Sequence, residues 1–191
     1  MTKARLEAFS DGVIAIIMTI MVLELKVPHG SDWTALRPVL LPFLTYVLSY
    51  VFLGIYWNGH HHMLHVTHRV NGSILWANLH LLFWLSLVPF VTGWMGENHV
   101  APEPTALYGV VMLGAGFAYN RLQCSIIDLH GPDSDLAKAV GRDMKGKLSH
   151  AMYALAIPLA FVNRWISVAI YVIVAVMWFL PDPRIESRMQ R

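Results

Sequence analysis

Charged side chains and cysteine are both scarce in this chain of 191 residues. Asp, Glu, Lys and Arg make up 14% of it, whereas an average soluble domain has about 25%. The formal net charge of +2 is too small to indicate binding of nucleic acid. Cys124 is the single cysteine, which excludes a disulfide framework and a multi-cysteine metal site. With 56% hydrophobic residues, the composition favours an integral membrane protein in a lipid bilayer.

Several sequence motifs of enzymes and channels are also missing. The chain has no Gly-rich phosphate loop, no nucleophile elbow and no Thr-Val-Gly-Tyr-Gly filter of the carbonyl type. A diiron membrane oxygenase would need further histidine boxes, but His80, His130 and His150 are scattered singly. We therefore expect no enzyme activity and no cofactor.

Six charge-poor segments fill most of the chain. They predict one all-α transmembrane domain over residues 1–191, with six helices at about 6–26, 36–58, 71–96, 104–127, 148–163 and 165–181. The last two are the shortest, near the lower limit of about 17 residues for a spanning helix.

Lysine and arginine are unevenly divided between the two predicted sides of the membrane. One side has only Lys26, Arg37 and Arg164. The other collects Lys3, Arg5, Arg69, Arg121, Lys138, Arg142, Lys145, Lys147, Arg184, Arg188 and Arg191. Because cytoplasmic loops carry the excess of positive charge, this distribution predicts a multi-pass protein of the cell (plasma or inner) membrane with both termini in the cytoplasm.

The first segment differs from the other five. Only the residues from 12 to 23 lack acids and bases, fewer than the about 20 apolar residues of a typical spanning helix. Arg5, Ser10 and Asp11 at its entrance are poorly suited to facing lipid, since ionisable groups in membrane segments usually face protein or water. The segment is therefore predicted to be the innermost helix, with the others arranged around it.

One face of this first helix carries branched apolar side chains. Ile16, Ile20 and Leu23 recur at helical spacing, and Thr19 lies beside them. On spacing alone this stripe is typical of an ordinary core face. The charged entrance favours a second interpretation, in which several copies around an axis form a narrow apolar constriction with a polar mouth.

A histidine-rich stretch ends the second segment. His61, His65 and His68 can share one helical face, a spacing that suits zinc. No cysteine or carboxylate lies nearby in the sequence, so the preferred interpretation is that one or two of these histidines hydrogen-bond Ser10 or Asp11. A histidine-dependent secondary transporter for zinc or protons is the alternative function.

The first half of the chain resembles a known family. The pattern Arg5-x-x-x-Phe9-Ser10-Asp11-Gly12-Val13-x-Ala15-Ile16-x-x-Thr19 is similar to the first-helix signature of transmembrane protein 175, an endolysosomal potassium-channel family, in its single-repeat prokaryotic form. Trp57 with the histidines after it, Asn78, and Pro89-Phe90-x-Thr92 resemble the second and third helices of that family. The second half matches only in helix count, and the run of three histidines at 60–62 departs from the family pattern.

The resemblance implies a homotetrameric potassium-permeable channel with six helices per subunit and the first helix lining a central pore. It implies a constriction at Ile16, Ile20 and Leu23, with Thr19 in the layer that favours potassium. It also implies a network that ties the first helix to its neighbours through Arg5, Phe9, Ser10, Asp11, Trp57, Asn78 and a histidine such as His60 or His61. Passive conduction with modest selectivity is expected, because no ring of carbonyls replaces the water that the ion loses.

Overall fold

The computed structural model describes residues 2–141 and 143–179, which form helices and no strand. In chain order these are α1 (Lys3–Ile20), the 3-10 helices η1 (Met21–Glu24) and η2 (Trp33–Leu36), α2 (Arg37–His65), α3 (Gly72–Ser86), α4 (Val88–Glu97), α5 (Pro102–His130), α6 (Asp135–Val140) and α7 (Met144–Phe179). Outside the described residues lie Arg142, the end of the segment expected at 165–181, and the tail with Arg184, Arg188 and Arg191.

Within the described ranges, four helical segments are long and apolar enough to cross a membrane. They are Lys3–Glu24, Trp33–His65, Gly72–Glu97 and Met144–Phe179. The protein is therefore embedded in a membrane and crosses it several times. α5 is not one of these four, although the sequence predicts a span at 104–127.

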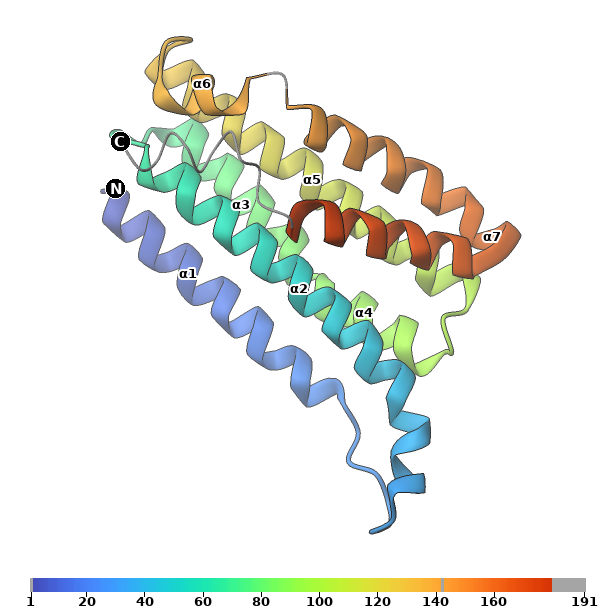
Figure 1. Ribbon diagram of the computed structural model, residues 1–191. Helices are drawn as coiled ribbons and strands as arrows, with labels where there is room; N and C mark the ends of the chain where they lie inside the picture. The colour runs from blue at the N-terminus through green and yellow to red at the C-terminus, as the bar shows by residue number, and fades with distance from the viewer. Residues whose placement is uncertain (1, 142, 180–191) are drawn as a thin grey trace.

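α5 occupies the centre of the helix bundle. It packs against α7 on one side and against α3 and α4 on the other, and its buried face includes Tyr108, Met112 and Ala115. α1 packs on α2 and α3 at the edge of the bundle (Figure 1). Within one subunit, the prediction that the first helix is innermost is thus wrong, because one whole face of α1 has no helix of its own chain beside it.

The segment predicted as one helix at 71–96 is broken in two. Leu87 separates α3 from α4, and its N–H donates to the carbonyl of Trp84, three residues back, at 3.2 Å. The cause is Pro89, which has no N–H to donate to Leu85 and whose ring would collide with that carbonyl in a continuous helix. After the break, α4 packs against the C-terminal end of α1 and against η1.

The segments predicted at 148–163 and 165–181 form the two arms of α7. Asn163 has non-helical dihedral angles of −155° and 105°, and its side-chain oxygen accepts the N–H of Trp165 at 3.0 Å. Figure 1 shows the second arm returning alongside the first. Two hydrogen bonds join the arms: Ser167 Oγ donates to the Ala156 carbonyl at 2.7 Å, and Trp178 Nε1 donates to Ser149 Oγ at 2.8 Å.

Glycines allow helices of this bundle to approach closely. The Trp84 ring of α3 lies directly over Gly114 of α5, where a Cβ would collide with it. On α4, a Cβ at Gly96 would lie 2.7 Å from Thr45 Oγ1 and 2.9 Å from Pro42 Cα on α2. Because Pro42 Cα belongs to the backbone, it cannot move aside as a flexible side chain would.

Replacing Gly96 with alanine is expected to destabilise the protein. The added methyl group overpacks the contact between α2 and α4, at a cost of about 1–3 kcal/mol. The measurement is the midpoint of thermal unfolding in detergent, followed by size-exclusion chromatography. Gly54→Ala in α2 is the control, because nothing lies within 4 Å of a Cβ at Gly54. Equal midpoints for the two variants would show that α2 and α4 do not touch at Gly96.

Candidate functional site

α1 has two contrasting faces. The face toward α2 and α3 is buried. It consists of Leu6, Ser10, Ile14 and Ile17, and it continues into η1 with Met21. The opposite face is exposed in the single subunit and carries Phe9, Ile16, Ile20 and Leu23. Ile16 is 58% and Leu23 is 77% exposed, whereas the neighbouring Ile17 is 5% exposed. The predicted constriction residues therefore share the open face of α1.

A chain of buried hydrogen bonds anchors α1 to α2 and α3. Ser10 Oγ donates to the Leu6 carbonyl at 2.8 Å and accepts from Asn78 Nδ2 at 2.9 Å. Asn78 Oδ1 then lies 2.7 Å from His60 Nε2. Since the amide nitrogen of Asn78 is the donor to Ser10, its oxygen must accept, which places the His60 proton on Nε2. Ser10, Asn78 and His60 are all fully buried.

Asp11 is held by a different partner from those expected. Its carboxylate accepts a hydrogen bond from Trp57 Nε1 at 3.0 Å, rather than from Arg5 or a histidine. Asp11 is half-buried and Trp57 is 43% exposed, so the bond lies at the surface of the subunit. No histidine contacts Ser10 directly either, because Asn78 stands between Ser10 and His60. The indole of Trp57 can donate through Nε1, so from α2 it can serve as the donor for the carboxylate on the neighbouring α1.

Arg5 and Phe9 face away from the bundle. Both side chains are exposed, and among the described residues Arg5 has no hydrogen bond or ion pair. On the same turn, Glu7 Oε1 lies 3.7 Å from His61 Nδ1. Within one subunit, Arg5 and Phe9 therefore do not tie α1 to other helices and are free to contact another molecule.

Thr19 uses its hydroxyl proton within α1. Thr19 Oγ1 donates to the carbonyls of Ala15 at 2.9 Å and Ile16 at 3.0 Å. The side chain is exposed beside Ile16 and Ile20. A hydroxyl that donates its one proton still has two acceptor lone pairs, so Thr19 presents oxygen electron density on the open face.

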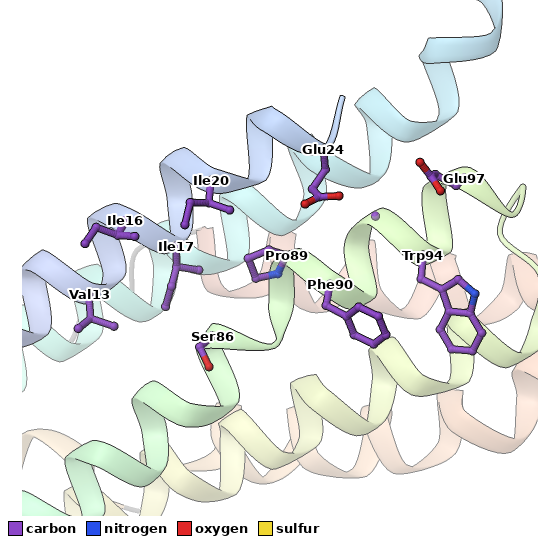
Figure 2. A pocket seen from close by; sticks show the side chains of 11 residues that line it. Val13, Ile16, Ile17, Ile20, Glu24, Ser86, Pro89, Phe90, Trp94 and Glu97 are labelled. Carbon is purple, nitrogen blue, oxygen red and sulfur yellow. The ribbon is translucent and has the colours of Figure 1, made fainter. Parts of the chain in front are cut away.

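An apolar groove of about 670 Å³ runs between α1 and α4. Figure 2 shows Ile16, Ile17 and Ile20 on one wall and Pro89 and Phe90 on the other. The glutamates at 24 and 97 stand at one end of the groove. At that end the Lys26 ammonium bonds Glu97 at 2.7 Å, and this hydrogen bond raises the pKa of Lys26.

The predicted histidine face for a metal does not form. α2 extends to His65, beyond its predicted end near residue 58, so His61 and His65 lie one turn apart with ring centroids 6.3 Å apart. The chain then leaves the helix, and the ring of His68 lies 6.2 Å from that of His130 instead. Nowhere in the part of the chain that the structure describes do three histidine, cysteine or acidic side chains gather to hold a metal ion. The zinc alternative therefore loses the geometry on which it depended.

A second buried polar cluster was missed by the sequence analysis. Thr92 Oγ1 donates to Ser49 Oγ at 2.7 Å, and Ser49 Oγ donates to the Tyr108 hydroxyl at 3.1 Å, which joins α4, α2 and α5. A usable signal was present: Thr45 and Ser49 lie four residues apart in an otherwise apolar stretch of α2. Polar groups on one face of a membrane helix need partners on a neighbouring helix.

The comparisons with known proteins agree with this architecture. A family model described as "Endosomal/lysosomal potassium channel TMEM175" matches residues 5–89. A protein of Chryseobacterium sp. that is named a potassium channel is 50% identical over 190 residues, which cover 100% of this chain and 99% of the relative. The chain belongs to this family. Its members are ion channels, which are not an enzyme class.

Two further members extend the likeness over the whole chain. A protein of Streptomyces collinus, also named a potassium channel, is 31% identical over 200 residues, which cover 97% of this chain and 96% of the relative. A crystal structure titled as a lysosomal potassium-selective channel TMEM175 homolog from Chamaesiphon minutus superposes with a TM-score of 0.77 at 27% identity. That match covers 92% of this chain and 95% of the other. The likeness thus includes α5 to α7, where the sequence alone offers no specific motif.

Removing the amide of Asn78 is expected to weaken the anchoring of α1. Asn78→Leu keeps the approximate shape of the side chain but leaves His60 Nε2–H buried without an acceptor, at a cost of about 1–3 kcal/mol. The readout is the midpoint of thermal unfolding in detergent. Trp57→Phe is the matched comparison, because it removes the surface bond to Asp11; water can solvate the freed carboxylate there, so the loss should be smaller than for Asn78→Leu. A larger loss for Trp57→Phe than for Asn78→Leu would contradict this ranking.

Proposed function

We propose that the chain is one subunit of a passive potassium channel in which four copies surround a central pore lined by α1. One observation carries the proposal: the signature residues of the first helix lie on two different faces. On one face Ser10 is hydrogen-bonded to buried Asn78, and on the other Ile16, Ile20 and Leu23 are exposed. An edge helix whose apolar face is exposed in the single subunit cannot enclose a pore alone. Closed rotational symmetry supplies the missing walls.

Each subunit would contribute six membrane-spanning helices to this assembly: α1, α2, the broken pair α3 and α4, α5, and the two arms of α7. Arg5 and Phe9, which are exposed in the single subunit, would meet the adjacent copy. The groove between α1 and α4 lies beside the open face of α1, so a neighbouring α1 around the axis is a fitting occupant. These features support a homotetramer with potassium as the permeant ion.

Ion preference would arise from dehydration at the apolar rings. Stripping water from an ion with no ligand in return is costly, and potassium loses its water more readily than sodium. The lone pairs of Thr19 on the same face would offset part of that cost. Because Thr19 gives one oxygen per subunit in place of a full set of carbonyls, the preference for potassium over sodium would be modest.

The contacts at the two ends of the bundle support the orientation inferred from charge. Lys3 Nζ donates to the His65 carbonyl at 2.7 Å, which places the start of α1 beside the end of α2. At the other end of the bundle, the ion pair of Lys26 with Glu97 joins the chain just after η1 to the end of α4. We assign the Lys3 end to the cytoplasm, with both termini, and the protein to the cell membrane of a prokaryote.

The assembly has a direct test in native mass spectrometry of the detergent-purified protein. The expected species contains four copies of the 21.5 kDa chain. Crosslinking between cysteines placed at Arg5 and Phe9 should then link adjacent copies, since both side chains face away from their own bundle. A monomer that still conducts ions would overturn the axial pore.

The constriction is tested by exchanging neighbouring residues on the two faces of α1. Ile16→Asn or Leu23→Ala should wet the apolar neck and raise the current, by about tenfold for each 1.4 kcal/mol removed from the barrier. The permeability ratio of potassium to sodium should fall at the same time. The measurement is planar-bilayer recording under a potassium/sodium gradient.

Ile17 and Met21 provide the controls, because both are buried against the subunit's own helices. Alanine at either position should lower stability and leave ion preference unchanged. If Ile17→Ala shifts the permeability ratio while Ile16→Asn does not, the pore lies on the other face of α1.

A further inference from the structure

The imidazole of His130 joins the end of α5 to the connection between α2 and α3, residues 66–71. His130 Nε2 lies 3.2 Å from the backbone nitrogen of His68 and 3.2 Å from that of Arg69. The other ring nitrogen, Nδ1, lies 2.8 Å from the Ile126 carbonyl. Both contacts at Nε2 come from N–H donors, so Nε2 must accept, and Nδ1 must carry the proton that goes to the carbonyl. The surroundings of the ring therefore fit one neutral tautomer.

We propose that His130 is a proton-sensitive clamp that holds the α2–α3 connection on α5 only while its ring is neutral. A proton on Nε2 would replace the acceptor lone pair with an N–H group that faces two backbone N–H groups. Both hydrogen bonds would be lost together and replaced by repulsion between donors. Histidine is the side chain that ordinarily changes charge between about pH 5 and 8.

Titratable and charged residues lie on the elements packed against His130. From the connection, the His68 ring faces it at 6.2 Å, and Arg69 adds a positive charge next to its own bonded N–H. α3 approaches this end of α5 through Ser73, which bonds Ser125 at 3.5 Å and does not titrate. Among the described residues that are close in sequence to His130, the charged ones are Asp128 on α5 and, in or just before α6, Asp133, Asp135 and Lys138.

The clamped connection joins the two helices that hold α1. His60 is on α2 before the connection and Asn78 is on α3 after it; Asn78 donates to Ser10, and His60 bonds Asn78. The start of α1 is also bonded to the end of α2, through Lys3 and the His65 carbonyl. Opening the clamp would therefore loosen the α2–α3 hairpin at the end where α1 is anchored. His130 is thus a positioning residue for α1, and this inference stands whether or not the chain conducts potassium.

Amide hydrogen exchange of the full-length protein in lipid nanodiscs tests the clamp without any ion flux. After correction for the intrinsic exchange rate, protection of the His68 and Arg69 amides should fall between pH 8 and pH 5.5. A single proton that binds only the open form predicts a slope of up to about tenfold per pH unit. Amides in the middle of α5 should show no such change.

Two glutamine variants separate the sensor from its neighbour. His130→Gln should abolish the pH dependence, because an amide does not titrate in this range. His68→Gln keeps the backbone donors and removes the facing ring, so the pH dependence should persist. Persistence in His130→Gln, or a flat profile in the parent protein, would overturn the proposal.

A spectroscopic measurement covers the case in which His130→Gln fails to fold. In the parent protein labelled with ¹⁵N-histidine, the His130 ring should show the Nδ1–H tautomer at pH 8. It should convert to the doubly protonated ring over the same pH interval in which the amides lose protection. An Nε2–H tautomer at pH 8 would rule out the clamp.

Discussion

A polar side chain in hydrocarbon must find its partner inside the protein, and that requirement fixes the position of α1. Ser10 has a local acceptor in the Leu6 carbonyl, but the lone pairs of its hydroxyl face α3, where Asn78 donates to them. The side-chain oxygen of Asn78 in turn accepts a hydrogen bond from His60 of α2. Three helices thus meet through directional bonds at one level, whereas apolar packing alone would leave the rotation of α1 poorly defined.

The rotation of α1 decides which side chains remain without partners. Consecutive residues of a helix point about 100° apart, so anchoring Ser10 toward α3 turns Ile14, Ile17 and Met21 inward and leaves Ile16 and Leu23 outward. An exposed apolar stripe on a membrane protein is not by itself unusual, because lipid can cover it. Here the same face also carries an accessible hydroxyl oxygen at Thr19. That combination suits a surface shared between copies around water and ions better than one facing lipid tails.

Sequence reasoning located α1 and its signature residues because the pattern is local: polar entrance, apolar stripe and flanking charge all fall within about six turns. It could not identify the partners, which depend on tertiary contacts. A histidine was expected as the partner of Ser10 or Asp11, yet the donor to Asp11 is the Trp57 indole. The face proposed for His61, His65 and His68 failed because no local signal revealed that α2 ends at His65. By contrast, the break before α4 has a readable cause in Pro89, whose effect on the preceding turn is steric.

The two ends of α1 are held by different kinds of contact. Near its start, three hydrogen bonds define its position, each with a restricted geometry: Ser10 accepts from Asn78, Asp11 accepts from Trp57, and Lys3 donates to the His65 carbonyl. Near its other end the neighbour is α4, and a mostly apolar groove lies between them, with the exposed Lys26–Glu97 pair at its end. Directional bonds therefore set where α1 stands, and the apolar half that follows can vary in side-chain size without changing that position. In the proposed channel, assembly would be separate from permeation: residues at the polar end would determine whether α1 reaches the axis, and Ile16, Ile20 and Leu23 would determine what an ion meets there.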